Sequence, residues 1–217
     1  MKSNNKNQQE SQTVFQSMQA CETGCIPRSA LQLSILRPSG SDNGYAKWDL
    51  CVLADYIVNV HHRYIRESGP VLLQSARKVA HHHGKHHHEL LQLETFLRHS
   101  LENMMTHMDQ EEIVLFPAIR QLVDPDRSVD QAGKESLQSI RQAVAKMRLE
   151  HLAAEDDLRL YRRLTHDYAL PSGACNSYKF LFDKLKEFEA NIHLHVHLEN
   201  DILFPRALAL HDNSHTR

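Results

Sequence analysis

HMDQEEIVLFP at residues 107–117 and HVHLENDILFP at residues 195–205 are near-copies of one motif, and they decide the fold expected of this chain. Each copy places a histidine four residues before a glutamate. The two pairs are His107 with Glu111 and His195 with Glu199. Residues four apart in a helix lie on one face, about one turn from each other. Each copy can therefore direct an imidazole and a carboxylate at one point, and two copies facing each other would form a site for two metal ions.

The chain around these motifs is predicted to be helical. It contains only seven glycines and seven prolines in 217 residues, and long stretches contain neither. Short breaks with turn residues, among them Gly84 and residues 170–173, separate long helical segments and therefore predict antiparallel neighbours. We expect an all-α, up-down-up-down antiparallel four-helix bundle over residues 46–212. Its helical segments are expected at roughly 47–82, 86–122, 131–167 and 175–210.

Two features modify this outline. Residues 1–45 are polar and rich in Asn, Gln and Ser, so we expect a flexible N-terminal tail. Pro70 falls inside the first helical segment, which should be kinked or broken there, and Pro117 should lie in the last turns of the second.

Each helical segment carries an apolar stripe at alternating steps of three and four residues, as expected of a bundle core. In the second segment the stripe comprises Leu93, Leu97, Ser100, Met104, His107, Glu111 and Val114. Titratable residues interrupt the four stripes at one level only. These residues are His62, His107, Glu111, His151, His195 and Glu199.

Carboxylates at core positions point to metal ions. An ionised carboxylate without a partner in a low-dielectric interior costs several kcal/mol, so it must be paired, neutralised or metal-bound. No lysine or arginine interrupts the stripes, whereas four neutral histidines would be good metal ligands. This mixed nitrogen and oxygen set suits iron, manganese or zinc better than calcium. We expect Glu111 and Glu199 to bridge two ions and the four histidines to bind them in pairs, with an oxide or hydroxide bridge balancing the remaining charge.

Other histidines and acids have simpler interpretations. Six histidines surround Gly84, where a solvated polar turn is expected and an accessory metal site is the alternative; they are His81, His82, His83, His86, His87 and His88. His61, His193 and His197 flank expected ligands, so we expect them at the surface or supporting the ligands from behind. Glu155 should be solvated or lie just outside the ligand set, and Glu150 should either carry protons or lie at the surface.

The remaining bulk properties bound the function. The 25 basic and 27 acidic residues give a formal net charge of −2, which indicates neither nucleic acid nor a membrane surface as a partner. No apolar run reaches the roughly 20 residues of a membrane span, and the N-terminus lacks a secretory signal. Four scattered cysteines suit a reducing compartment. We therefore expect a soluble cytoplasmic protein, with Cys21 and Cys25 as thiols of the tail, or alternatively with a metal or redox role.

The ordered set of motifs resembles the hemerythrin-like di-iron proteins, and most closely the repair-of-iron-centres group. The matching elements, spread over about residues 48–210, are VHHR at 60–63 before Pro70, the two motifs quoted above, and Glu150-His151. In that group an N-terminal domain often carries adjacent paired cysteines, whereas here Cys21 and Cys25 are separated by three residues.

This resemblance implies a function. It implies a non-haem di-iron centre that supports repair of iron-sulfur clusters damaged by nitric oxide or oxidants, with iron donated to the damaged proteins. Two other functions stay open: a di-iron reductase of nitric oxide or peroxide, and an oxygen or redox sensor that signals through its tail.

Overall fold

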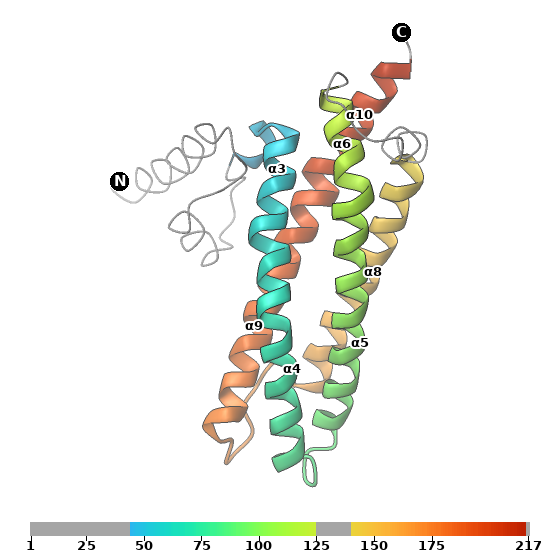
Figure 1. The fold of residues 1–217 in the computed structure, drawn as a ribbon. Coiled ribbons are helices and arrows are strands. Elements are labelled where there is room, and N and C mark those ends of the chain that lie inside the picture. Colours follow the sequence, from blue (N-terminus) through green and yellow to red (C-terminus); the bar gives the residue numbers. More distant parts are fainter. Residues whose placement is uncertain (1–43, 125–139, 216–217) are drawn as a thin grey trace, which may run out of the picture.

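The computed structural model describes residues 44–124 and 140–215, which form four long antiparallel helices (Figure 1). The first helix runs through α3 (Leu50–Tyr56), the π-helical turn η2 (Ile57–His62) and α4 (Arg63–His83). The second runs through α5 (Glu89–Gln110), the π-helical turn η3 (Glu111–Leu115) and α6 (Phe116–Val123). The third is α8 (Ile140–Leu164), and the fourth comprises α9 (Asn176–His197), the π-helical turn η4 (Leu198–Leu203) and α10 (Phe204–His215). The expected up-down-up-down bundle is confirmed.

The ends of the helices follow local sequence signals. The side chain of Asp49 accepts hydrogen bonds from the backbone N–H groups of Cys51 and Val52, at 2.8 and 3.3 Å, and so caps the first helix. A short 3-10 helix η1 (Tyr45–Lys47) precedes it. Gly84 ends α4, as expected.

The third helix ends at Leu164, three residues before the end expected at 167. His166, Asp167 and Tyr168 have positive φ angles of 48°, 57° and 61°, which a right-handed helix excludes. The backbone N–H of Tyr168 donates to Oγ1 of Thr165 at 3.1 Å, and the Tyr168 ring is buried. This local bond and the burial of the ring offset the cost of the turn.

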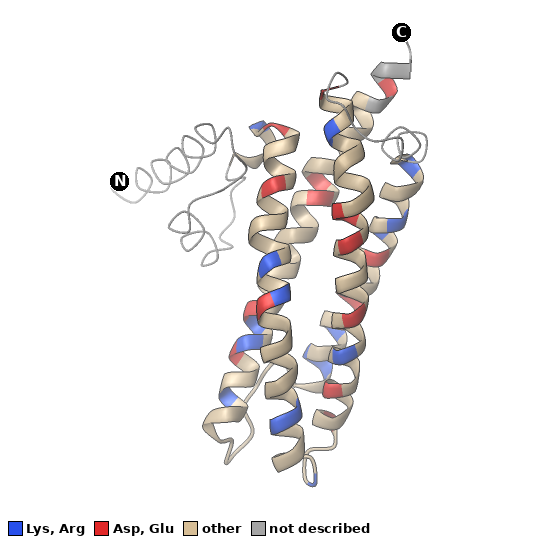
Figure 2. Cartoon of the chain, in the orientation of Figure 1, with Lys and Arg blue, Asp and Glu red and all other residues tan. Residues whose placement is uncertain are grey.

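Two apolar clusters make up the core, one on each side of a polar layer. One cluster, formed largely by α4, α5 and α9, contains Leu72, Leu93, Leu97, Leu181 and Leu185. The other cluster contains Leu53, Ile57, Phe116, Ile119 and Phe204. Acidic and basic residues are interspersed along the helices (Figure 2), in keeping with the nearly balanced charge of the chain. Among the described residues, none of the helices has both the length and the apolar character that crossing a membrane requires.

The π-helical turns are the main departure from the sequence-based prediction. The expected core residue Val114 is 42% exposed, whereas its neighbour Leu115 is buried. The extra residue in a π turn shifts the register by one position, so the expectation for Val114 was wrong. In the second and fourth helices the π turn ends at the leucine of a Leu-Phe-Pro sequence. A proline in these two helices cannot donate the backbone hydrogen bond of a regular helix, but η2 forms without a nearby proline and α4 contains Pro70.

The first helix continues through Pro70 within α4, so it is not broken there. The neighbouring Gly69 marks a close approach of α4 and α5. A Cβ atom at this position would lie 2.9 Å from Cδ2 of Leu101. The absence of a side chain therefore allows these two helices to pack closely.

Several expectations fall outside the described residues. They concern the tail up to residue 43 with Cys21 and Cys25, and residues 131–139 at the start of the third helical segment. The boundary between tail and bundle at residues 45 and 46 stays a prediction. On the bundle side of it, Tyr45 packs edge-on against Trp48 with ring centroids 5.0 Å apart.

Candidate metal centre

The six residues expected from the stripes converge in the polar layer, where each is buried. The π-helical turns position three of the six. His62 ends η2, Glu111 begins η3 and Glu199 lies in η4. His107 and His195 lie four residues before their glutamates, in the last turns of α5 and α9, and His151 lies in the middle of α8. All four helices of the bundle therefore contribute to one site.

One half of the site contains His62 and His195. Their Nε2 atoms are 3.2 Å apart. Oε2 of Glu111 lies 3.3 Å from Nε2 of His62 and 3.9 Å from Nε2 of His195, while Oε1 of Glu199 lies 3.0 Å from Nε2 of His195. Two imidazole nitrogens and two carboxylate oxygens thus surround one point.

The other half repeats this arrangement with His107 and His151. Their Nε2 atoms are 3.0 Å apart. Here the opposite oxygens of the same carboxylates take part: Oε1 of Glu111 lies 3.3 Å from Nε2 of His107, and Oε2 of Glu199 lies 3.0 Å from Nε2 of His151. Each glutamate therefore presents one oxygen to each half of the site.

The donor set fits two metal ions. In each half the four ligand atoms lie within 4.8 Å of one another. All four carboxylate oxygens of Glu111 and Glu199 are buried without a hydrogen bond, which is costly unless cations compensate their charge. Residues with neutral nitrogen and anionic oxygen donors, closely spaced in a dry interior, are what a pair of transition-metal ions requires.

Three of the histidines donate a hydrogen bond from Nδ1, the ring nitrogen that faces away from the site. The acceptors are residues that the stripes did not identify. Nδ1 of His62 donates to Glu112 at 2.7 Å, and Nδ1 of His107 donates to Glu150 at 2.7 Å. Nδ1 of His151 donates to Oδ1 of Asn200 at 3.1 Å. Such contacts fix the tautomer of the ring and leave Nε2 available for a metal.

A sequence signal for these partners exists. Glu112, Glu150 and Asn200 each adjoin an expected ligand in the chain, so they lie about 100° around the helix and face the neighbouring helix. Glu150 is therefore neither isolated nor purely a surface residue. Its side chain is 35% exposed and also lies 3.7 Å from Nζ of Lys146.

The electrostatics of the layer show how the charges balance without metal. Burial opposes the charged form of His62, but the carboxylates of Glu111 and Glu112 outweigh it and raise the pKa of His62 to about 9. Burial is likewise outweighed at His107, where Glu111 raises the pKa to about 9. At Glu199 burial is outweighed by His151, which lowers the pKa of the carboxyl. Protonated His62 and His107 can therefore offset two buried carboxylates where cations would otherwise do so.

His61 and His195 behave in the opposite way. Burial and the neighbouring His195 lower the pKa of His61 to about 3, and burial and His62 lower the pKa of His195 well below its usual value. The two rings are stacked, with centroids 6.0 Å apart and planes at 9°. His61 is thus a buried neutral residue behind a site histidine, which contradicts the expectation of a surface position and fits the alternative.

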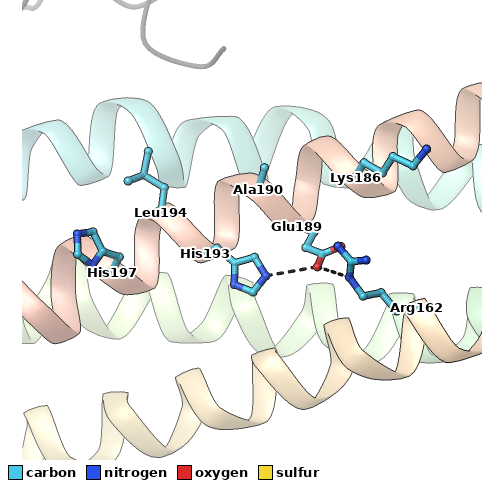
Figure 3. Close-up of a pocket in the computed structure, with 7 residues that line it drawn as sticks. All are labelled: Arg162, Lys186, Glu189, Ala190, His193, Leu194 and His197. Atoms are coloured by element: carbon cyan, nitrogen blue, oxygen red, sulfur yellow. Dashed lines mark hydrogen bonds and ion pairs between the residues drawn. The ribbon is translucent and has the colours of Figure 1, made fainter. Parts of the chain in front are cut away.

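The other flanking residues lie at the surface. His193 and His197 are about half exposed on the outward side of α9. Figure 3 shows them lining a cavity of about 390 Å³, with Nε2 of His193 3.3 Å from Oε1 of Glu189, which also accepts a hydrogen bond from Arg162. Glu155 pairs with Arg159 at 3.0 Å, away from the six buried residues.

A second cavity, of about 230 Å³, lies beside the site between α5, α8 and α9. Its lining includes His107 and Glu150 at one end and Ala154, Asp157 and Tyr161 further along. Tyr161 donates to Ser100 at 2.6 Å, and Ser100 donates to Asp157. The cavity gives the half of the site that contains His107 a small neighbouring space with polar groups in its wall.

Comparison with known proteins places this site in a family. Residues 53–207 match the model of the hemerythrin HHE cation binding domain. The chain belongs to this family. Its members are defined by a cation-binding domain, and the buried histidines and glutamates suit such a metal-binding site.

Curated relatives in the family carry a more specific name. The chain is 34% identical over 179 residues to the iron-sulfur cluster repair protein YtfE of Yersinia pseudotuberculosis serotype IB, strain PB1/+. The match covers 82% of this chain and 75% of the relative. The protein of the same name from Yersinia pestis, strain Pestoides F, matches with the same identity and coverage.

Proposed function

We propose that this chain is a di-iron protein that supports the repair of iron-sulfur clusters damaged by nitric oxide or oxidants, by donating iron to the damaged protein. The observation that carries the proposal is the shared use of Glu111 and Glu199 by both halves of the buried site. The names of the curated relatives support the repair role. The proposed setting is the cytoplasm, with damaged iron-sulfur proteins as partners.

In this proposal His62 and His195 would hold one iron, His107 and His151 would hold the other, and Glu111 and Glu199 would offer an oxygen to each. When bound, the pair of irons supplies redox chemistry and exchangeable iron. Glu112, Glu150 and Asn200 keep the ligand rings oriented. Manganese and zinc use similar donor sets, so the proposal of iron rests on the family and on the proposed role.

The chain's own residues suggest which half releases iron. His62 and His195 are fully buried and flanked by His61, whereas His107 lines the cavity of about 230 Å³. Glu150 binds His107 through one carboxylate oxygen, and its side chain reaches solvent. Protonation of Nε2 of His107 would displace a metal, because a protonated imidazole cannot bind one, and the cavity gives protons and small molecules a space beside this ring. We therefore assign the exchangeable position to the half with His107 and His151.

Two measurements test this function. Metal analysis of protein purified from its native cell should give two irons per chain. Iron-loaded protein should then reactivate an enzyme whose cluster nitric oxide has damaged, and Glu111→Leu should lose this activity. Glu155→Leu is the matched control, since Glu155 also follows a site histidine by four residues but points away from the layer. Equal reactivation by wild type and Glu111→Leu would refute the proposal.

The cavity beside His107 favours one second candidate, a reductase of nitric oxide or peroxide. Its volume suits a small molecule, and the Tyr161–Ser100–Asp157 chain in its wall provides polar groups for a proton. Steady conversion of nitric oxide to nitrous oxide with an electron donor would support this candidate. Reaction that stops after one equivalent would count against it.

A further inference from the structure

The turn between α4 and α5 carries the histidine-rich sequence HHHGKHHH at residues 81–88, far from the buried site. The structure brings one of these histidines to a cysteine that is distant in sequence. Nε2 of His83, in the last turn of α4, lies 3.2 Å from Sγ of Cys175, which precedes α9. The end of α4 and the start of α9 both lie at the lower end of the bundle in Figure 1.

His87 lies next to this pair. Its backbone N–H donates to the carbonyl of His83 at 3.0 Å, so the two residues are one helical turn apart on the same side of the chain. Both rings lie against Tyr178 of α9, with centroids 5.3 and 5.9 Å from the tyrosine ring. Nδ1 of His87 donates to Oε1 of Glu89 at 2.9 Å. In this arrangement Nδ1 is occupied, and Nε2 is the ring nitrogen that is available as a donor atom.

We propose that His83, His87 and Cys175 form a second metal-binding site, for a divalent cation of the zinc class. Two imidazoles and a thiolate are a set that favours tetrahedral zinc over iron, with water as the fourth ligand. Two such donor atoms on one tetrahedral ion are about 3.5 Å apart, which the contact of 3.2 Å between His83 and Cys175 already approaches. The thiol proton of Cys175 leaves to solvent on binding, because the thiolate is the ligand.

His87, the third proposed ligand, reaches the other two only after its side chain rotates. Among the described residues, groups of three or more donor atoms mutually within 4.8 Å occur only in the buried layer. At the lower end of the bundle two donor atoms are in contact, and His87 is partly exposed and can turn toward them. This site is therefore assembled when the metal binds.

The two sites are physically separate. His62 and His83 are connected by α4, and at 1.5 Å per residue the sites lie about 30 Å apart. The proposed site contains sulfur, whereas the buried layer contains only nitrogen and oxygen donors. Occupancy of one site can therefore be measured while the other is filled, and this proposal stands independently of the repair function.

Cobalt(II) is the probe for the test, because a cobalt–thiolate bond gives a near-ultraviolet charge-transfer band. The full chain, iron-loaded and with Cys21→Ser and Cys25→Ser to remove thiols of the tail, is titrated with cobalt(II) under a reductant that does not bind metal. One equivalent should produce the band, and zinc should abolish it by displacement. Cys175→Ser should remove the band, and His83→Ala and His87→Ala should each weaken binding at least tenfold.

Matched variants separate this site from general binding by a histidine-rich turn. Cys51→Ser and His81→Ala should leave the band and the affinity unchanged. A band that persists in Cys175→Ser would overturn the proposal, as would its absence from the parent protein. Loss of affinity in His86→Ala or His88→Ala with none in His87→Ala would equally overturn the assignment.

Discussion

Glu112 accepts a hydrogen bond from Nδ1 of His62 at 2.7 Å, across the interface between the first and second helices of the bundle. Glu112 also accepts a hydrogen bond from Arg66 at 2.6 Å, which holds the carboxylate in place. The residue next to a buried glutamate thus orients a histidine of another helix. The metal site depends on such contacts between helices as much as on the spacing within one helix.

Removing this contact should weaken metal binding. Glu112→Ala frees the His62 ring to rotate, so we expect metal affinity to fall about 10–100-fold, as is typical when a ligand's supporting partner is removed. Competition with a chelator measures the change. Glu67→Ala is the control, because Glu67 is an exposed glutamate of α4 that lies 4.0 Å from Arg63. Equal affinities in the two variants would show that Glu112 does not support the site.

Substituting one of the two shared carboxylates should affect the binding of two metal ions, whereas substituting one histidine should affect mainly one. Each glutamate presents one carboxylate oxygen to one half of the layer and its other oxygen to the other half. Glu199→Leu should therefore lower the bound metal in both halves, whereas His151→Ala should lower it mainly in one. Metal analysis after gel filtration counts the ions per chain. Full loss of both ions in His151→Ala would contradict the division of the site into two halves.

The stability of the metal-free protein should be greatest near pH 6.5. The pKa values of His62 and His107 are raised to about 9, so their contribution is complete below pH 6.5 and is lost as the pH rises through 9. The pKa of His61 is lowered to about 3, so unfolding becomes easier as the pH falls from 6.5 toward 3. Denaturant unfolding across this range measures the profile. Metal-loaded protein is the comparison, and it should lose the decline between pH 6.5 and 9 because bound histidines are neutral. A metal-free profile that rises through this interval would contradict the assignment.

Filling the cavity beside His107 should hinder small molecules without removing metal. Ala154 lines this cavity, and Ala154→Leu adds a side chain to it. We expect several-fold slower reaction of the iron-loaded protein with nitric oxide or peroxide, measured by stopped-flow absorbance, and an unchanged metal content. Ala190→Leu is the matched control, since Ala190 lines the other cavity, on the outward side of α9 (Figure 3). Equal slowing in both variants would rule out the cavity beside His107 as the route.

The close approach at Gly69 should be sensitive to added volume. A Cβ atom there would lie 2.9 Å from the buried Leu101, so Gly69→Val should destabilise the fold by about 1–3 kcal/mol. Urea unfolding measures the loss. Glu67→Val places the same branched residue at an exposed position of α4 and should cost much less. A stability of Gly69→Val equal to that of this control would mean that α4 and α5 can separate at little cost.

Much of the fold and the residues of the layer could be predicted, because both depend on periodicity. The step of three and four residues that identifies a core face also identifies polar residues on it, and so His62 and Glu199 were placed together although they lie on different helices. What periodicity cannot give is the rotation of one helix against the next. The contact of Glu112 with His62, and that of Asn200 with His151, depends on this rotation.

Regular periodicity also failed where the helix itself is irregular. The prediction for Val114 assumed an α-helix throughout, whereas the structure has a π turn there that leaves Val114 exposed. The position of His61 was left open between two alternatives for a related reason. Within η2 the consecutive residues His61 and His62 are both buried, which a stripe with steps of three and four does not allow.

The number of residues in each π turn matters for the metal layer. Deleting one residue from η3 would remove the extra residue of the π turn, and the segment could then close as a regular α-helix. Phe116 and Ile119 would keep their buried positions, whereas the wide turn that begins at Glu111 of the layer would be lost. Insertions and deletions during evolution should therefore accumulate in the connections between helices, while the distance along the chain from His107 to Phe116 stays constant.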